Sequence, residues 1–165
     1  MAQKLLNGAD LAGFIKERQA KQVRGLRQAH GISPKLAIIQ TKDDPIIDTY
    51  VNLKKAYGAD ILINVDIHRV KQSEAQELIR ELNADSSVHG IIIQLPLEDS
   101  SATEVLCNLV DPAKDVDGLG EKPDFQEATP MAIMWLLAGY NVELSGKKIL
   151  IIGQGKLVGK PLAKE

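Results

Sequence analysis

Apolar segments alternate along the chain with segments of helical periodicity, and this alternation limits the possible folds more than any other feature. Strands are expected over residues 34–41, 61–67, 88–95 and 147–153. Helices are expected over residues 11–31, 44–60, 73–85, 102–110 and 130–140. The stretch VHGIIIQL has the continuous apolar run of a strand that is buried on both faces of a parallel sheet. The alternation predicts an α/β fold, with a three-layer N-terminal domain around a mostly parallel sheet.

Short local signals predict several helix ends. Gly31 is typical of a residue that ends a helix, and Asp44 followed by Pro45 is typical of a helix start. Ser73 and Thr129 are expected to cap the third and the last of the predicted helices.

Composition excludes several classes of partner. The 165 residues are enough for one domain with a full core and the start of a second. The net charge of -2 gives no indication of a nucleic-acid or membrane partner, and no apolar run has the length of a membrane span. The single cysteine, Cys107, cannot form an intrachain disulfide and is expected to be a small core residue. These features predict a cytoplasmic protein.

Tyr50 and Lys54 are four residues apart, so they share one face of the predicted second helix. A partly desolvated lysine can have a lowered pKa and act as an acid or base near neutral pH. An aromatic ring beside it can stack on a planar substrate. The same pair also fits an ordinary solvated helix. Short-chain dehydrogenases share the spacing, but their glycine-rich turn precedes the pair, whereas here it follows, and this order excludes them.

Two further polar sites follow predicted strands. Gln94 ends a buried strand, at the sheet edge where α/β proteins bind ligands. Its amide could hold a lysine or the edge of a heterocycle, or it could simply be solvated. Asp115 and Asp117 are expected to point the same way from an extended segment. A carboxylate there could accept two parallel hydrogen bonds from the edge of a ring such as a pterin, although Asp117-Gly118 also fits an ordinary turn. No metal site is expected here, because metal binding would need more ligands and the histidines are scattered along the chain.

The C-terminal segment has the pattern that opens a dinucleotide-binding domain. Residues 149–152 are expected to form a buried strand, Gly153 and Gly155 a tight turn, and Leu157 the start of a helix. The spacing is G-x-G-x-x-x-G, in which the third glycine comes one place late. Such a turn can bring phosphate to backbone N–H groups at a helix start, and a turn without any ligand is the alternative.

Five segments in the same order resemble the bifunctional methylenetetrahydrofolate dehydrogenase/methenyltetrahydrofolate cyclohydrolase family. They are YVNLK, GIIIQLPL, DPAKDVDG, ATPMAIMWLLAGYNVELSGKK and GQGKLVGKP. The resemblance implies a folate-binding catalytic domain over residues 1–143 and the start of an NAD(P)-binding Rossmann-like domain over residues 144–165. It implies NAD(P)-dependent oxidation of 5,10-methylenetetrahydrofolate, hydrolysis of the product to 10-formyltetrahydrofolate, and a homodimer.

The resemblance also implies roles for single residues in the folate site. Lys54 corresponds to the central catalytic lysine, which assists opening and hydration of the one-carbon bridge. Tyr50 corresponds to the aromatic residue that packs on the folate, and Gln94 to the partner that positions the lysine. Ile93 and Leu95 are implied in substrate binding.

For substrate recognition and cofactor binding, the resemblance implies two further sets of residues. Asp117 corresponds to the carboxylate that recognises the pterin. Gly153, Gln154 and Gly155 correspond to the turn that binds the cofactor phosphate. Gly155 stands where the family usually has a serine, so the resemblance leaves NADP and NAD both open.

Departures from the family pattern keep two other functions open. Ile47 stands where a serine is usual, and Ala56 where a second lysine is usual. They motivate the alternative of an inactive folate-binding or scaffold remnant, and a shikimate-dehydrogenase-like oxidoreductase shares the two-domain plan. Because the family's cofactor domain is much longer than residues 144–165, we expect this chain to be a fragment without dehydrogenase activity of its own.

Overall fold

A three-stranded parallel sheet lies at the centre of the computed structural model, which describes residues 5–165. Its strands are β1 (Lys35–Gln40), β2 (Asn64–Arg69) and β3 (Gly90–Ile93), in the order β2-β1-β3. Helix α2 (Pro45–Asp60) connects β1 to β2, and helix α3 (Ala75–Ala84) connects β2 to β3. Ile38 of the central strand is in register with Ile67 on one side and Ile92 on the other. The predicted α/β fold with a parallel sheet is confirmed.

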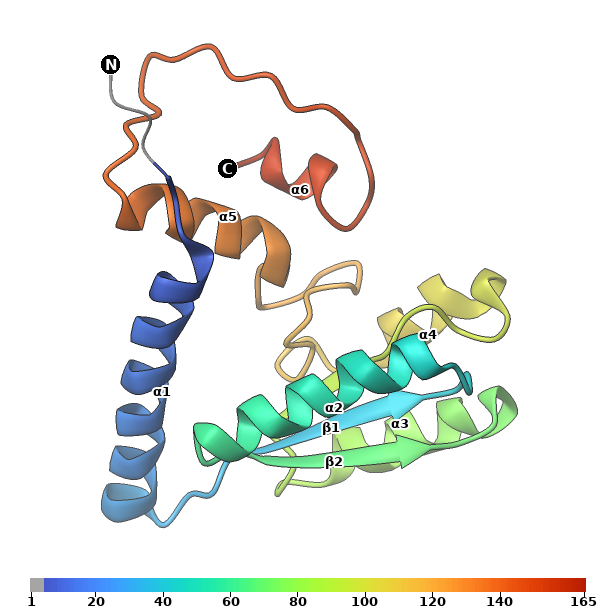
Figure 1. The fold of residues 1–165 in the computed structure, drawn as a ribbon. Helices are drawn as coiled ribbons and strands as arrows, with labels where there is room; N and C mark the ends of the chain where they lie inside the picture. The colour runs from blue at the N-terminus through green and yellow to red at the C-terminus, as the bar shows by residue number, and fades with distance from the viewer. Residues whose placement is uncertain (1–4) are drawn as a thin grey trace.

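The sheet separates two apolar cores, because alternate side chains of a strand point to opposite faces. Ile38 packs with Ile47 and Val51 of α2 on one face. Ile39 packs with Ile79 of α3 on the other face, in the core that also includes α4 (Thr103–Leu109). Figure 1 shows α2 in front of the sheet and α3 behind it, so the three predicted layers are present.

Cys107 is a residue of α4 and lies in the core that α3 and α4 form with the sheet, as predicted. Its side chain is buried, and burial together with the nearby Asp115 charge raises the pKa of the thiol to about 11. A thiol with a raised pKa is a weak nucleophile near neutral pH. Cys107 is therefore a packing residue.

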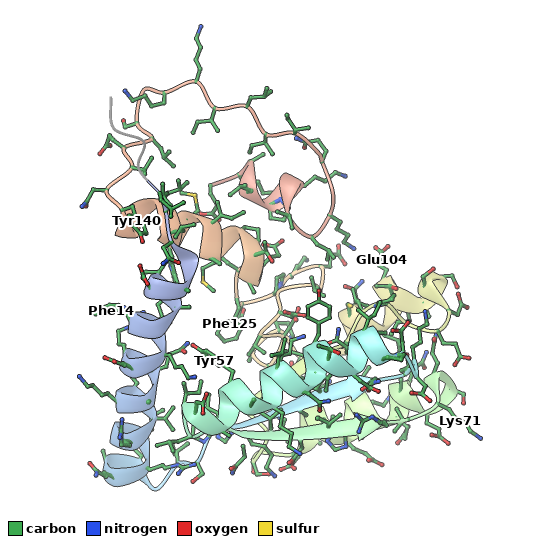
Figure 2. The ribbon with its side chains drawn as sticks, viewed as in Figure 1. Phe14, Tyr57, Lys71, Glu104, Phe125 and Tyr140 are labelled. Carbon is green, nitrogen blue, oxygen red and sulfur yellow. The ribbon has the colours of Figure 1, made fainter. Side chains whose placement is uncertain are left out.

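The long helix α1 (Gly8–His30) lies beside this three-layer unit, with helix α5 (Ala128–Gly139) next to its N-terminal end (Figure 1). The Tyr57 hydroxyl donates to Gln19 Oε1 at 2.7 Å, which joins α2 to α1. The Tyr140 hydroxyl accepts from the Asn7 N–H at 3.0 Å, and both tyrosines are labelled in Figure 2.

The remaining elements are the short 3-10 helices η1 (Gln72–Glu74) and η2 (Ser100–Ala102) and the helix α6 (Gly159–Leu162). Within residues 5–165, no helix is both long and apolar enough to cross a membrane.

Two of the predicted helix ends are confirmed. Gly31 ends α1 in the left-handed conformation, with φ 67°. The Asp44 carboxylate accepts from the Ile46 N–H at 2.8 Å and so caps α2, with Pro45 in the first turn.

The other two predicted caps are wrong. Ser73 lies inside η1, and the Glu74 carboxylate, rather than the serine hydroxyl, accepts from the Lys71 N–H at this point of the chain. Thr129 lies inside α5, whose N-cap residue is Glu127. In both cases the helical turn begins earlier than the residue type suggested, so the hydroxyl no longer sits at the cap position.

Strand β2 begins three residues later than predicted, at Asn64 instead of residue 61. The Ile61 N–H still donates to Tyr57 O and so completes α2. Leu62 then adopts a left-handed conformation with φ 68°, which a strand cannot include. Residues 61–63 therefore form the turn after α2, and pairing with β1 begins only at Asn64.

The predicted strand at residues 147–153 is wrong. The exposed fractions of Ile149, Leu150 and Ile152 are 60%, 84% and 92%. Figure 1 shows this stretch as an extended loop that arches from α5 to α6. In the described chain no strand lies beside it, and a strand needs a neighbour to take its backbone hydrogen bonds.

Candidate functional site

A small cavity of about 160 Å³ lies at the carboxyl end of β3, where Gln94 follows the strand. It is lined by Lys54, Ile93, Gln94, Leu95, Asp117, Leu119, Glu127, Ala128, Thr129 and Leu157. These residues come from α2, β3 and the loop after it, the loop around Asp117, the start of α5, and the segment before α6. The structure thus brings together Lys54, Gln94 and Asp117, which were predicted from the residues themselves, and Ile93 and Leu95, which the resemblance implied.

Two residues that line the cavity are joined by a hydrogen bond, which Lys54 Nζ donates to Gln94 Oε1 at 2.7 Å. The other end of the Gln94 amide is also fixed, because Nε2 donates to the Leu95 carbonyl oxygen at 2.8 Å. Gln94 is only 8% exposed, so its amide has little freedom to turn. An ammonium has three donors, and this bond leaves Lys54 with donors to offer to a ligand.

Helix α2 places Lys54 at this point through its buried face. Ile47 and Val51 are buried against the sheet, and Lys54 follows them at helical spacing. Lys54 therefore emerges at the edge of the core rather than on the outer surface. Tyr50, one turn earlier, is 57% exposed and does not line the cavity. Its ring remains available to a ligand that extends out of the cavity.

The loop that carries Asp117 is held from inside by Asp115. The buried Asp115 carboxylate accepts from the N–H groups of Gly118, Leu119 and Gly120, at 3.1, 3.4 and 2.8 Å. Asp117 instead lines the cavity that contains Lys54. The prediction that the two carboxylates point the same way is wrong, because the chain forms a turn here rather than an extended segment.

The surroundings of Asp117 shift the pKa of its carboxylate. Burial raises its pKa above the ordinary value, the nearby Lys54 charge lowers it, and the Asp115 charge raises it. Burial is the largest of these effects. A carboxylate that has lost part of its hydration gains more from hydrogen-bond donors on a ligand than one in open water.

Gly118 allows the Asp117 loop to approach the start of α5. Its φ is +68°, and a Cβ atom at this position would lie 2.8 Å from Phe125 O and 3.0 Å from Glu127 N. Only glycine fits both the conformation and the space. This close approach brings Glu127 and Thr129 to the same cavity as Asp117.

Glu127, Thr129 and Leu157 also line the cavity, although no role in the site was predicted for them. Glu127 is half-buried and gives the cavity a second carboxylate. Its only sequence signal is its position directly before the matching segment that begins at Ala128. Leu157 was predicted to start a helix, but it lies in the turn before α6, which begins at Gly159, so its position in the cavity depends on the tertiary fold.

The predicted cofactor turn lies just before Leu157. Gly153 has φ +103°, and open space surrounds the positions where Gly153 and Gly155 would carry a Cβ. A Cβ at Gly159 would clash with Gly153 O, so the late third glycine is required where α6 meets the turn. Backbone groups at this turn are thus open to a phosphate. In residues 5–165 no group of three or more His, Cys, Asp or Glu side chains could hold a metal ion.

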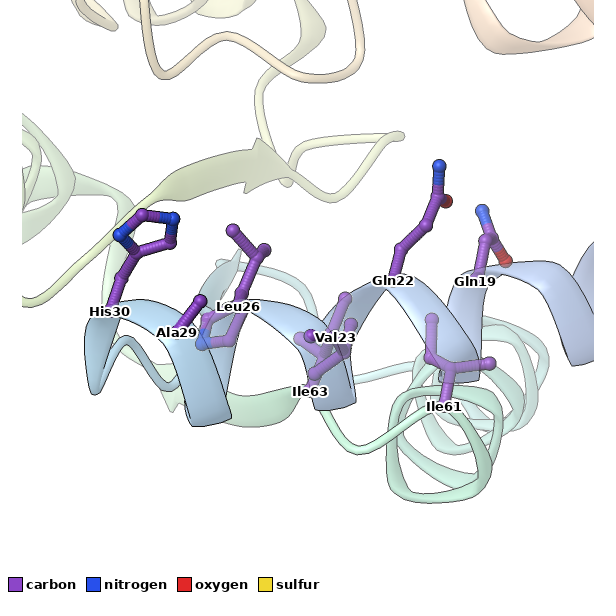
Figure 3. A pocket seen from close by; sticks show the side chains of 10 residues that line it. Gln19, Gln22, Val23, Leu26, Ala29, His30, Ile61 and Ile63 are labelled. Carbon is purple, nitrogen blue, oxygen red and sulfur yellow. The ribbon is translucent and has the colours of Figure 1, made fainter.

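A larger cavity, of about 740 Å³, lies along α1 (Figure 3). Its lining is mostly apolar and includes Val23, Leu26 and Ile63. Neither Lys54 nor Asp117 reaches it. Size alone would select this cavity, but the groups that can do chemistry meet at β3.

Two family models match the chain. Residues 6–117 match the tetrahydrofolate dehydrogenase/cyclohydrolase catalytic domain, and residues 127–165 match the NAD(P)-binding domain of the same family. The bifunctional protein FolD of Maridesulfovibrio salexigens is 38% identical, over 96% of this chain and 60% of that protein. The FolD protein of Heliobacterium modesticaldum is 36% identical, over 98% of this chain and 61% of that protein. The chain therefore spans about 60% of the length of the curated relatives it matches.

Solved structures agree in fold. The bifunctional enzyme FolD, methylenetetrahydrofolate dehydrogenase/cyclohydrolase, from Campylobacter jejuni gives a TM-score of 0.93 at 34% identity, over 98% of this chain and 62% of that one. The Trypanosoma brucei methylenetetrahydrofolate dehydrogenase-cyclohydrolase, complexed with NADP cofactor and inhibitor, gives 0.90 at 26% identity, over 99% of this chain and 61% of that one.

Proposed function

Because the chain belongs to the tetrahydrofolate dehydrogenase/cyclohydrolase family, we propose that its cavity at β3 is the folate site of a one-carbon enzyme. The whole protein would oxidise 5,10-methylenetetrahydrofolate to the methenyl form with NADP or NAD, and hydrolyse that product to 10-formyltetrahydrofolate. The observation that carries the proposal is the Lys54–Gln94 hydrogen bond in the same cavity as Asp117. Family membership favours this function over a shikimate-dehydrogenase-like enzyme. The intact set of polar groups favours it over an inactive remnant.

In this proposal Asp117 accepts two parallel hydrogen bonds from the 2-amino and N3 edge of the pterin. This orients the ring so that the one-carbon bridge faces Lys54. Ile93 and Leu95 supply apolar contacts beside the ring, and the exposed Tyr50 packs on the part of the folate that leaves the cavity. Positioning of this kind contributes much of the rate when a bound group must meet a reacting atom.

Lys54 is the proposed acid–base residue, and Gln94 holds it in place. During hydrolysis, water adds to the methenyl carbon and one carbon–nitrogen bond of the bridge breaks. Water loses both of its protons as its oxygen becomes the formyl oxygen. The Lys54 ammonium can supply a proton to the released nitrogen and then regain one from the added water, and the second proton of the water leaves to solvent. The Gln94 oxygen keeps the ammonium directed at the bridge.

The dehydrogenase step needs a nicotinamide cofactor, which supplies the hydride acceptor when bound. Gly153, Gln154 and Gly155 are the proposed residues for its phosphate. The open space around both glycines supports this role, because the phosphate can approach the backbone without meeting a side chain. Leu157 would then stand between the cofactor turn and the folate cavity.

We also propose the broader properties that go with this function. Residues 1–143 would form the folate-binding catalytic domain and residues 144–165 would belong to the NAD(P)-binding domain. The protein would act in the cytoplasm as a homodimer, without a nucleic-acid or membrane partner. The net charge of -2 is in keeping with a small-molecule enzyme.

A direct test compares Lys54→Met with Lys55→Met. The two lysines are neighbours on α2, but Lys55 is exposed and does not line the cavity. We expect the wild type and Lys55→Met to bind a tetrahydrofolate analogue and to hydrolyse the methenyl form. Lys54→Met should reduce hydrolysis roughly 100-fold or more, as is typical for a lost acid–base group. No binding by the wild type, or equal hydrolysis by both variants, would refute the proposed function.

A further inference from the structure

Lys114 makes an unusual set of contacts for a lysine near the surface. Its Nζ donates to the carbonyl oxygens of Leu82, Asn83 and Asp85, at 2.9, 2.7 and 2.8 Å. These carbonyls end α3, where the last turn of a helix lacks intrahelical donors. A positive charge at a helix C-terminus is also electrostatically favourable. Lys114 therefore ties its own loop to the end of α3.

The next residue fixes the other side of the same loop. The three hydrogen bonds that Asp115 accepts hold the N–H groups of residues 118–120. The backbone of Lys114 is also paired with β3, since the Ile91 N–H donates to Lys114 O at 2.8 Å. Only Val116 and Asp117 lie between the two sets of attachments. The position of Asp117 is thus determined by contacts on both sides.

We infer that Lys114 is a positioning residue for the Asp117 carboxylate, and this inference rests on the proposed folate function. Lys114 does not line the cavity. It acts by holding the loop at a fixed distance from α3, so that Asp117 faces Lys54 across a cavity of only about 160 Å³. A small displacement of the loop would spoil two parallel hydrogen bonds to a ring edge before it affected the reaction at Lys54.

The test uses a pair of pterin ligands, a folate analogue and the same analogue without its 2-amino group. In the wild type, the missing amino group should weaken binding roughly tenfold, because Asp117 loses a charge-assisted hydrogen bond. In Lys114→Met, which keeps the stem and removes the ammonium, the two ligands should bind almost equally. KM for the folate substrate should rise several-fold while kcat for hydrolysis changes less than about twofold, because Lys54 and Gln94 are untouched.

Three further variants keep the test decisive. Lys114→Arg should restore most of the discrimination between the ligands. Lys21→Met, on the exposed face of α1, should leave it unchanged. Asn83→Ala loosens the same attachment by another route, since Asn83 Nδ2 donates to Leu109 O and its Oδ1 accepts from the Asp111 N–H. Asn83→Ala should also reduce the discrimination between the two ligands, and it provides the test if Lys114→Met fails to fold.

The outcomes separate the two proposals. If the wild type binds neither pterin, the proposed function fails. If the wild type discriminates and the Lys114 and Asn83 variants discriminate equally well, Lys114 does not position Asp117. Loss of thermal stability with equal weakening of both ligands would also overturn the inference, because it would show a general role in folding only.

Discussion

Two apolar runs of this chain, residues 90–93 and residues 149–152, are alike in sequence and different in structure. Each ends close to a glutamine, in GIIIQ and in LIIGQ. The first forms β3, pairs with β1 and is buried at every position. In the second, Ile149, Leu150 and Ile152 are exposed, and the run pairs with no strand in the described chain. An apolar run therefore supplies a strand only where the rest of the fold supplies its neighbour.

A similar contrast applies to two glycine turns, one at Gly118 and one at Gly153 and Gly155. The turn at Gly118 has its amides bound by Asp115 and packs against residues 125–127. The turn at Gly153 and Gly155 has open space around both glycines. The first turn is organised by the protein itself and presents a side chain, Asp117. The second has backbone groups that a ligand could approach.

The largest expected difference between the two runs is in their contribution to stability. Ile91 is buried in β3, whereas Ile152 is 92% exposed. Ile91→Ala should lower the free energy of unfolding by about 2–5 kcal/mol through lost burial and a residual cavity. Ile152→Ala should change it by less than about 0.5 kcal/mol. Urea unfolding of both variants checks this, and similar losses in the two would mean that residues 149–152 are packed.

A matched pair of glycine substitutions tests the two turns. Gly118→Ala should cost about 1–3 kcal/mol, because alanine is strained at φ +68° and its Cβ would meet the backbone of Phe125. Gly155→Ala meets open space at an ordinary φ and should cost little. Thermal unfolding of both variants measures the difference. A Gly118→Ala protein as stable as the wild type would contradict the close approach that the structure shows.

Limited proteolysis compares the same regions without mutation. Lys147 and Lys148 lie in the exposed segment before residues 149–152, and Lys114 lies in the loop attached to α3. Trypsin should cut at the first two at least about tenfold faster, since cleavage requires local unfolding of an anchored segment. Mass spectrometry of the early fragments identifies the sites. Early cleavage after Lys114 would show that its loop is not held as the hydrogen bonds indicate.

Much of the fold and of the candidate site could be predicted because the signals are local. The burial of β3 and the spacing of Ile47, Val51 and Lys54 follow from strand and helix periods. Gln94 could be placed at the sheet edge because it ends a buried strand. The position of Lys54 against Gln94 follows once the helix crosses the sheet.

The remainder depends on contacts between distant segments. Residues 149–152 carry a strand pattern, but no local signal tells whether a neighbouring strand is present. Glu127 and Leu157 reach the cavity only because Gly118 and the C-terminal turn pack where they do. Asp115 and Asp117 separate because backbone amides bind one of them, and their spacing of two residues does not contain that information.

The smallest expected effect is a change with pH in the stability that Asp117 contributes. Burial raises the pKa of Asp117 in the folded protein above its ordinary value of 3.8. The folded state therefore binds the proton more tightly, and ionised Asp117 lowers the free energy of unfolding at neutral pH. Asp117→Asn cannot ionise, so it should be modestly more stable than the wild type at pH 7. This advantage should decrease as the pH falls through the raised pKa, and it should disappear near and below pH 3.8.

Asp115→Asn should instead be less stable than the wild type, because three backbone N–H groups lose a charged acceptor. Urea unfolding of the three proteins across this pH range decides the matter. A stability difference between Asp117→Asn and the wild type that stays constant with pH would mean that the pKa of Asp117 is not raised by folding.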